Sequence, residues 1–191
     1  MVKFPSNFTI KANQLALTPV VKSDAFELYQ LMAIPEISRD MAWSPHSDLH
    51  ESQTFLRNAI DDFKKGKSVH WCIRFECKII GLFSLIDIRG LHRAIVYNRA
   101  EIAYWLDPNY QRRGFMSDAA SAVIAFAFKK IKLNKILVSH HDGNIPSKKL
   151  INKLHFQPTY FEKEAFFKNG KKIDVYHYQL FFSDWLKLTN E

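Results

Sequence analysis

Two arginines and a glycine stand where an apolar stretch gives way to an alanine-rich one, in WLDPNYQRRGFMSDAA, residues 105–120. If a strand precedes and a helix follows, this turn exposes the free backbone N–H groups of a helix N-terminus, and such groups bind anions. Gly114 would let the backbone approach a phosphate without a Cβ in the way, while Arg112 and Arg113 add positive charge. A glycine turn flanked by solvated arginines fits the same residues, so the pattern alone leaves both interpretations open.

A carboxylate and a pair of histidines are the other candidates for chemistry. Glu101 lies on the stretch AEIAYWL that leads into the turn, where a glutamate can act as a general base or simply occupy the polar face of a strand. His140 and His141 are adjacent, so a strand would point them to opposite faces, and no third residue has metal-ligand spacing. Cys72 and Cys77 are too few for a disulfide framework and lack metal-site spacing. We therefore expect two free thiols and no metal.

The elements that must position these residues alternate along the chain. Hydrophobic periodicity and capping residues predict a strand at 15–21, helices at 23–33 and 47–66, and strands at 69–75, 78–88 and 100–106. A helix at 116–131, a strand at 135–140, a helix at 146–154 and strands at 158–168 and 172–182 follow. The last two strands flank Asn169-Gly170, a pair typical of a type I′ hairpin turn. This order predicts one mixed sheet covered by helices.

Length and charge restrict the class of protein. The 191 residues suit one domain with a good core, and the net charge of +8 favours a polyanionic partner such as nucleic acid, a ribosome, an acidic protein or a phosphorylated cofactor. Neither common glycine-rich nucleotide motif is present. The apolar runs are too short to span a bilayer, and the N-terminus has no secretory signal pattern, so we expect a cytoplasmic protein without a membrane partner.

Several segments together carry a resemblance to a known family. AEIAYWLDPNYQRRGFMSDAASAVIAFAF and NIPSKKLINKLHF resemble the acetyl-CoA signature of the GNAT N-acetyltransferases, in particular the RimJ/RimL group of ribosomal-protein N-terminal acetyltransferases. LALTPVVKSDAFELYQL, MAWSPH and KNGKKIDVYHYQL extend the likeness over nearly the whole chain. The resemblance implies an α/β fold of GNAT type, with a mixed, mostly antiparallel central sheet flanked by helices. It also implies a single domain over residues 1–191, with its core at about 9–183.

The resemblance implies acetyl-CoA as the acetyl donor, with no metal, and it suggests which residues bind it. The backbone beside Trp105 and Leu106 would hydrogen-bond the pantetheine arm, and Asn144 would touch that arm or simply cap the next helix. The pyrophosphate would be held by Gln111, Arg112, Arg113, Gly114, Phe115, Met116 and Ser117. Met116 departs from the family pattern, which has a small residue there, and His155 stands where glycine is usual.

The same resemblance suggests residues for the chemistry and for the acceptor. Glu101 would be the base, and Ser147 would return a proton to the CoA thiolate or only bind CoA. Trp43 and His46 would line the acceptor pocket or, equally, form an aromatic lid that packs on the core. Glu164 would be a second carboxylate facing the acceptor amine. An α-amine has an ordinary pKa near 7.7 to 8, so an N-terminal acceptor needs only modest help from a base.

These implications favour transfer of acetyl to a primary amine, first of all the N-terminal α-amine of a protein, with ribosomal proteins as leading candidates. One alternative is a small-amine acetyltransferase that acts on a polyamine, an amino sugar or an aminoglycoside. Another is a non-catalytic module that binds acetyl-CoA or RNA. The sequence leaves open whether the protein is a monomer or a homodimer.

Overall fold

A computed structural model describes residues 9–92 and 95–189. Its sheet has eight strands in the order β1-β2-β3-β4-β5-β6-β8-β7, and every neighbouring pair is antiparallel except β5 and β6. The expected fold class, a mostly antiparallel sheet flanked by helices, is therefore confirmed. Residues 1–8, which carry the expectation about a secretory signal, lie outside the described residues.

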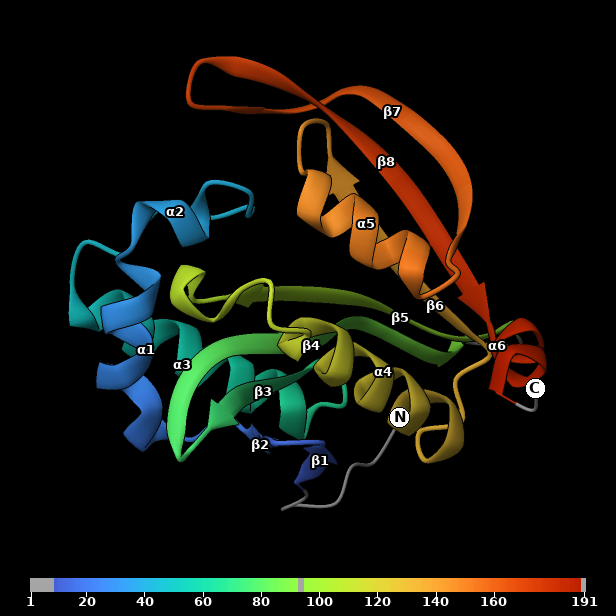
Figure 1. Ribbon diagram of the computed structural model, residues 1–191, viewed down its shortest axis with the longest axis horizontal. Coiled ribbons are helices and arrows are strands. Elements are labelled where there is room, and N and C mark those ends of the chain that lie inside the picture. The colour runs from blue at the N-terminus through green and yellow to red at the C-terminus, as the bar shows by residue number, and fades with distance from the viewer. Residues whose placement is uncertain (1–8, 93–94, 190–191) are drawn as a thin grey trace.

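The elements follow one another along the chain as strands, helices and two short 3-10 turns (Figure 1). The strands are β1 (Ile10–Ala12), β2 (Leu15–Pro19), β3 (Val69–Phe75), β4 (Lys78–His92), β5 (Ile95–Leu106), β6 (Lys135–His141), β7 (Gln157–Lys168) and β8 (Lys171–Phe181). The helices are α1 (Ala25–Met32), α2 (Pro35–Ser38), α3 (Leu49–Lys64), α4 (Phe115–Lys129), α5 (Ile145–Lys153) and α6 (Phe182–Thr189), with 3-10 turns η1 (Lys22–Asp24) and η2 (Pro108–Tyr110).

Helices cover the sheet on both faces, and each face has its own apolar cluster. On one face α4 and α5 pack on the sheet around buried residues such as Phe83, Val123 and Ile151. On the other face α1 and α3 pack around Leu28, Leu56 and Leu82. Figure 1 shows α1, α2 and α3 gathered at one end of the molecule, with the long β7–β8 hairpin arching past α5 toward that end. Successive residues of β5 thus face different clusters, so one strand serves both sides of the sheet.

Local sequence signals explain several boundaries. Helix α3 begins after Asp48, whose side chain accepts a hydrogen bond from the Glu51 amide at 3.0 Å, as expected for an N-cap. Asn169 and Gly170 have φ values of 50° and 76°, which confirms the predicted hairpin turn. The strand predicted at 69–75 ends at a turn in which Glu76 and Cys77 both have positive φ.

Three elements were not predicted, namely β1, α2 and α6. The first two have three and four residues, which is too short for a periodic pattern to show. The C-terminal residues after β8 form α6, where Trp185 packs against Phe128 at 5.5 Å between ring centroids. The predicted strand at 15–21 ends earlier, at Pro19.

The two cysteines are free, Cys72 buried and Cys77 exposed, as expected. Burial raises the pKa of the Cys72 thiol, which therefore stays protonated. None of the helices in the described part of the chain is long and apolar enough to cross a membrane.

His70 gives the fold a specific sensitivity to acid. Its ring lies between Ser84 Oγ at 2.8 Å and Ser68 Oγ at 3.1 Å, and burial lowers its pKa from 6.5 to about 4. Between pH 6.5 and 4, His70 is protonated in the unfolded chain but neutral in the folded chain. The free energy of unfolding therefore falls as the pH drops from 6.5 toward 4. Between pH 7 and pH 5 we expect His70 to account for a loss of about 2 kcal/mol.

Urea unfolding of the parent and of a His70→Gln variant at several pH values measures this effect. The variant starts with lower stability, but its stability should depend less on pH across that window. Equal slopes for the two proteins would contradict the assignment to His70.

Candidate active site

The sheet opens between β5 and β6. The two strands are in register only from Arg99–Glu101 to Lys135–Leu137, although β5 continues to Leu106 and β6 to His141. Beyond Glu101 the strands diverge, so one edge of β5 is left without a neighbouring strand. Such an edge can hydrogen-bond an extended ligand as if it were an added strand.

Alternation along β5 identifies the backbone groups that face this opening. The Asp107 amide donates to the Ile80 carbonyl on β4 at 2.8 Å. Because successive residues of a strand point their backbone groups to opposite sides, those of Leu106 and Tyr104 point away from β4. Of the two residues predicted to hold the pantetheine arm, Leu106 therefore offers its amide to the opening, whereas the Trp105 backbone faces β4.

Gly114 forms the turn at the start of α4, as the sequence predicted. Its φ is 85°, in the left-handed region, and a Cβ added there would meet no protein atom within 4 Å. The first hydrogen bond of the helix runs from the Asp118 amide to the Gly114 carbonyl, so the amides of residues 115–117 have no acceptor within the helix. Three free amides beside an open space fit a phosphate group.

The side chains around this turn take roles that the sequence did not specify. The Phe115 side chain is buried in the core and the Met116 side chain packs against that core, so neither obstructs the free amides of residues 115–117. Gln111 Nε2 donates to the Leu106 carbonyl at 3.1 Å, which ties the turn to the end of β5. Gln111 and Met116 thus shape the turn, while the free backbone amides are the groups suited to an anion.

The two arginines of the turn differ. The Arg113 guanidinium lies over three rings, at 4.6 Å from the centroid of Phe115, 5.2 Å from Phe75 and 5.6 Å from Tyr110. Cation–π contacts of this kind hold the turn against the end of β3. Arg112 is exposed and has a positive φ of 59°. Both charges remain near the turn, but only Arg112 is without aromatic neighbours among the contacts of the described residues.

Ser147 meets a residue that the sequence analysis missed. Its hydroxyl lies 3.0 Å from the Tyr104 hydroxyl, and its amide donates to Asn144 Oδ1 at 3.1 Å, so Asn144 caps α5. Tyr104 stacks on Phe83, and burial raises its pKa to about 12. Tyr104 stays protonated at neutral pH, so it can donate to Ser147. The tyrosine was visible in AEIAYWL, but no local pattern links it to a serine 43 residues away.

Glu101 lies where the opening closes, on the face of the sheet opposite Tyr104. It is directly in register with Leu137 on β6, the last pair before the strands diverge. Its carboxylate accepts a hydrogen bond from Ser139 Oγ at 3.1 Å, and its side chain is only partly buried. A half-buried carboxylate with one fixed hydrogen bond keeps lone pairs available for a proton.

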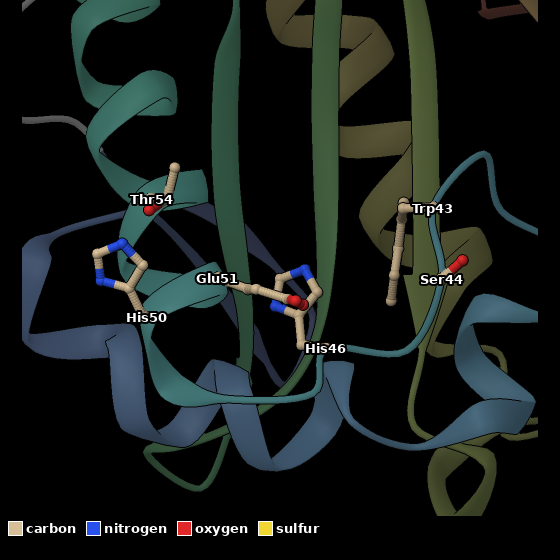
Figure 2. Close-up of a pocket in the computed structure, with 6 residues that line it drawn as sticks. All are labelled: Trp43, Ser44, His46, His50, Glu51 and Thr54. Carbon is tan, nitrogen blue, oxygen red and sulfur yellow. The ribbon is translucent and has the colours of Figure 1, made fainter.

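Trp43 and His46, predicted to bind the acceptor, lie on the loop of residues 39–47, hereafter the Trp43 loop. With Ser44 and three residues of α3 (His50, Glu51 and Thr54) they line a pocket of about 560 Å³ (Figure 2). The Trp43 and Trp105 rings pack edge to face with their centroids 6.4 Å apart, which places this pocket beside the end of β5. Burial lowers the pKa of His46, whose Nδ1 lies 2.7 Å from Ser52 Oγ, against the opposing effect of Glu51 and Asp48.

The other predicted acceptor residue, Glu164, lies elsewhere on the β7–β8 hairpin. Its carboxylate pairs with Lys172 at 2.5 Å, and its amide donates to Asp174 Oδ1. It does not line the pocket beside Trp43.

The adjacent histidines point apart, as predicted. His140 is buried against Tyr178, with Nε2 3.0 Å from the hydroxyl, whereas His141 Nε2 lies 3.0 Å from Asp40 on the opposite face. Within residues 9–92 and 95–189 there is no group of three or more potential metal ligands.

Comparisons with known proteins show which domain this chain contains. A model of the acetyltransferase (GNAT) domain matches residues 14–157. The chain is 29% identical over 176 residues to the uncharacterized N-acetyltransferase p20 of Bacillus licheniformis, covering 90% of this chain and 95% of that protein. Two relatives from Escherichia coli (strain K12) follow. One is a ribosomal-protein-serine acetyltransferase, 25% identical with 87% and 93% coverage, and the other a spermidine N(1)-acetyltransferase, 24% identical with 84% and 82% coverage.

A solved structure shows the same fold. The RimL ribosomal L7/L12 alpha-N-protein acetyltransferase in complex with Coenzyme A superposes with a TM-score of 0.84 at 21% identity, over 93% of this chain and 99% of that one. The turn at Gly114 and the free edge of β5 fit the phosphate and pantetheine parts of acetyl-CoA, the acetyl donor of this family. Because the match to the GNAT domain model covers well over half of this chain, the chain belongs to the GNAT family of N-acetyltransferases.

Proposed function

We propose that this enzyme acetylates the α-amine at the N-terminus of a protein or peptide, with ribosomal proteins as the first candidates. The observation that carries the proposal is the position of Glu101 at the closed end of the β5–β6 opening, on the face of the sheet that the Trp43 loop borders. A base at this point can take a proton from an amine that enters beside Trp43 and Trp105. An α-amine has an ordinary pKa near 7.7 to 8, so a single carboxylate can deprotonate it at neutral pH.

The charge near Glu101 favours this acceptor over a polyamine. Arg99 is two residues before Glu101 on β5 and so shares its face of the sheet. Arg89 on β4 and Lys135 on β6 are the register partners of Arg99. Asp87 offsets one of these three positive charges through ion pairs at 2.8 Å to Arg89 and 3.7 Å to Arg99. A row with net positive charge repels a polycation and attracts an acidic residue downstream of an N-terminus.

A polyamine nevertheless remains the second candidate, because the spermidine acetyltransferase relative is nearly as similar as the ribosomal one. At such identities the residues of this chain, and not the names of its relatives, decide the acceptor. The row of Arg89, Arg99 and Lys135 is the feature that distinguishes the two candidates.

The residues divide the chemistry between the two faces of the sheet. Acetyl-CoA, when bound, supplies an acetyl thioester whose carbonyl carbon is open to attack by an amine. Glu101 accepts the proton of the incoming ammonium group, directly or through a water molecule. The Leu106 amide, on the free edge of β5, donates a hydrogen bond to negative charge that develops on an oxygen in the opening. Ser147 and Tyr104 lie on the other face and provide a donor for a departing thiolate.

Removing the Tyr104 hydroxyl tests the last of these roles. We expect Tyr104→Phe to lower kcat about tenfold, because Ser147 loses the donor that replenishes its proton, while the acetyl-CoA dissociation constant changes less than about twofold. Phe83 should stack on phenylalanine as it does on tyrosine, so the fold is preserved. Steady-state kinetics with calorimetry measure both quantities, and an unchanged kcat would remove Tyr104 from the mechanism.

Assaying thiol release from acetyl-CoA against matched acceptors tests the proposed function. The set contains N-terminal peptides with acidic or basic residues at positions two and three, their N-terminally blocked forms, spermidine, amino sugars and aminoglycosides. We expect turnover with free N-termini and the highest kcat/KM with acidic peptides. Turnover of spermidine alone would support the second candidate, and tight acetyl-CoA binding without any turnover would support a non-catalytic module.

A further inference from the structure

Lys168, at the end of β7, makes contacts that the chemistry above does not use. Its Nζ donates to the backbone carbonyl oxygens of Ser38 at 2.7 Å, Trp43 at 3.2 Å and Arg39 at 3.4 Å, and also to that of Met41. These four residues belong to the end of α2 and the Trp43 loop, about 125 to 130 positions away in the sequence. One side chain thus joins the tip of the β7–β8 hairpin to the loop that borders the acceptor pocket, consistent with the course of the hairpin toward α2 in Figure 1.

The ammonium group of Lys168 suits a cluster of carbonyl oxygens. A lysine ammonium has three N–H donors and no acceptor, so it can serve three carbonyl oxygens at a time and exchange among the four. Carbonyl oxygens that converge on one point carry partial negative charge, and an apolar side chain there would remove the Lys168 donor from all four. The Ser38 carbonyl would keep its hydrogen bond from the Met41 amide at 3.0 Å. Burial lowers the pKa of Lys168, whereas the nearby Asp40 carboxylate opposes that shift.

The loop has further attachments, and His46 provides two of them: its amide donates to the Met32 carbonyl at 3.0 Å, and its Nδ1 lies 2.7 Å from Ser52 Oγ. Asp40 accepts a hydrogen bond from His141 Nε2 at the end of β6, at 3.0 Å. The Trp43 ring rests against Trp105, at 6.4 Å between centroids, and against His46, at 5.5 Å. The Trp43 carbonyl that Lys168 contacts belongs to the same residue whose ring lines the pocket, so moving that carbonyl moves the wall of the pocket.

We propose that Lys168 is a positioning residue for the acceptor: by binding the carbonyls of the Trp43 loop, it fixes Trp43 beside Trp105 and thereby forms the acceptor pocket. The proposal rests on the proposed function insofar as this pocket receives the amine. It makes acceptor binding depend on the β7–β8 hairpin, although Lys168 itself need not touch the acceptor. Acetyl-CoA binding, which uses the Gly114 turn and the edge of β5, is independent of it.

The test replaces Lys168 with methionine, which keeps an unbranched apolar chain and removes the donors. We expect the KM for the acceptor peptide to rise about tenfold, with kcat and the acetyl-CoA dissociation constant within about twofold of the parent. Lys168→Arg, which keeps charge and N–H donors, should restore most of the loss. Lys171→Met is the matched control, because Lys171 is exposed and pairs with Lys168 across the hairpin, and it should behave as the parent.

A second measurement reports on the loop without turnover. Trp71, Trp105 and Trp185 are buried, whereas Trp43 is partly exposed, so quenching of tryptophan fluorescence by acrylamide is sensitive to the position of Trp43. Quenching should increase in Lys168→Met but not in Lys171→Met, and the increase should vanish when Trp43 is also replaced by phenylalanine. Parent-like quenching in Lys168→Met would overturn the proposal. Increased quenching with an unchanged acceptor KM would show that the loop moves but does not form the acceptor site, which also overturns it.

These outcomes separate the proposal from the proposed function. If no acceptor is turned over by the parent, the proposed function fails, while the quenching experiment still shows whether Lys168 fixes the loop. If Lys168→Met folds poorly, Lys168→Gln, which retains an amide donor, allows the same comparison by both readouts. An acceptor KM and quenching equal to those of the parent would then count against the positioning role.

Discussion

We expect the Glu101→Gln variant to lose about 10²- to 10⁴-fold in kcat, the usual contribution of a general base. Glutamine keeps the shape of the side chain and the hydrogen bond from Ser139, which lies 3.1 Å from the carboxylate, but it cannot accept a proton at neutral pH. The dissociation constant of acetyl-CoA should hardly change, because the Gly114 turn does not involve Glu101. The effect should shrink as the pH rises past the ordinary pKa of an α-amine, since more acceptor then arrives neutral.

Steady-state kinetics of parent and variant between pH 6 and 9, on the best acceptor of the panel, measure this loss. Glu164→Gln is the matched control, because Glu164 is the other carboxylate predicted for the site and pairs with the exposed Lys172. A Glu101→Gln enzyme as active as the parent at pH 6.5 would give Glu101 a structural role. A large loss in Glu164→Gln instead would move the base to the hairpin.

The Gly114→Val variant should bind acetyl-CoA at least about 100-fold more weakly than the parent, which corresponds to losing one or two charge-assisted hydrogen bonds. Valine disfavours the φ of 85° that this turn requires, so the three free amides of α4 would no longer converge. Its side chain would also occupy the open space beside the turn, where no protein atom lies within 4 Å of an added Cβ. Both effects act on the position that a phosphate would take.

Gly170→Val separates anion binding from backbone strain. Gly170 has a φ of 76° and equally open surroundings, but it lies in the β7–β8 turn. Both variants should lose similar stability in thermal unfolding, while calorimetry should show weakened acetyl-CoA binding for Gly114→Val alone. Equal affinities in the two variants would refute the phosphate role of the turn.

The sequence by itself determined the local elements and the position of the turn. Period-two and helical patterns placed β3 exactly where the structure has it, and α4 and β6 within two residues at each end. The turns at Asn169-Gly170 and Gly114 were predictable because they need positive φ, and glycine and asparagine are the residue types that adopt it most readily. The resemblance to the GNAT family favoured Glu101 as the base and added Ser147 as a candidate.

Only the tertiary structure decided which side chains meet. Tyr104 and Ser147 are 43 residues apart, and Lys168 and Trp43 are 125 apart, so neither contact leaves a periodic signal in the sequence. The same holds for Arg113, whose three aromatic neighbours come from β3, η2 and α4. A pattern of burial shows which face of an element turns inward, but not what packs against it. The partners are set by the packing of the whole chain, which brings distant elements together.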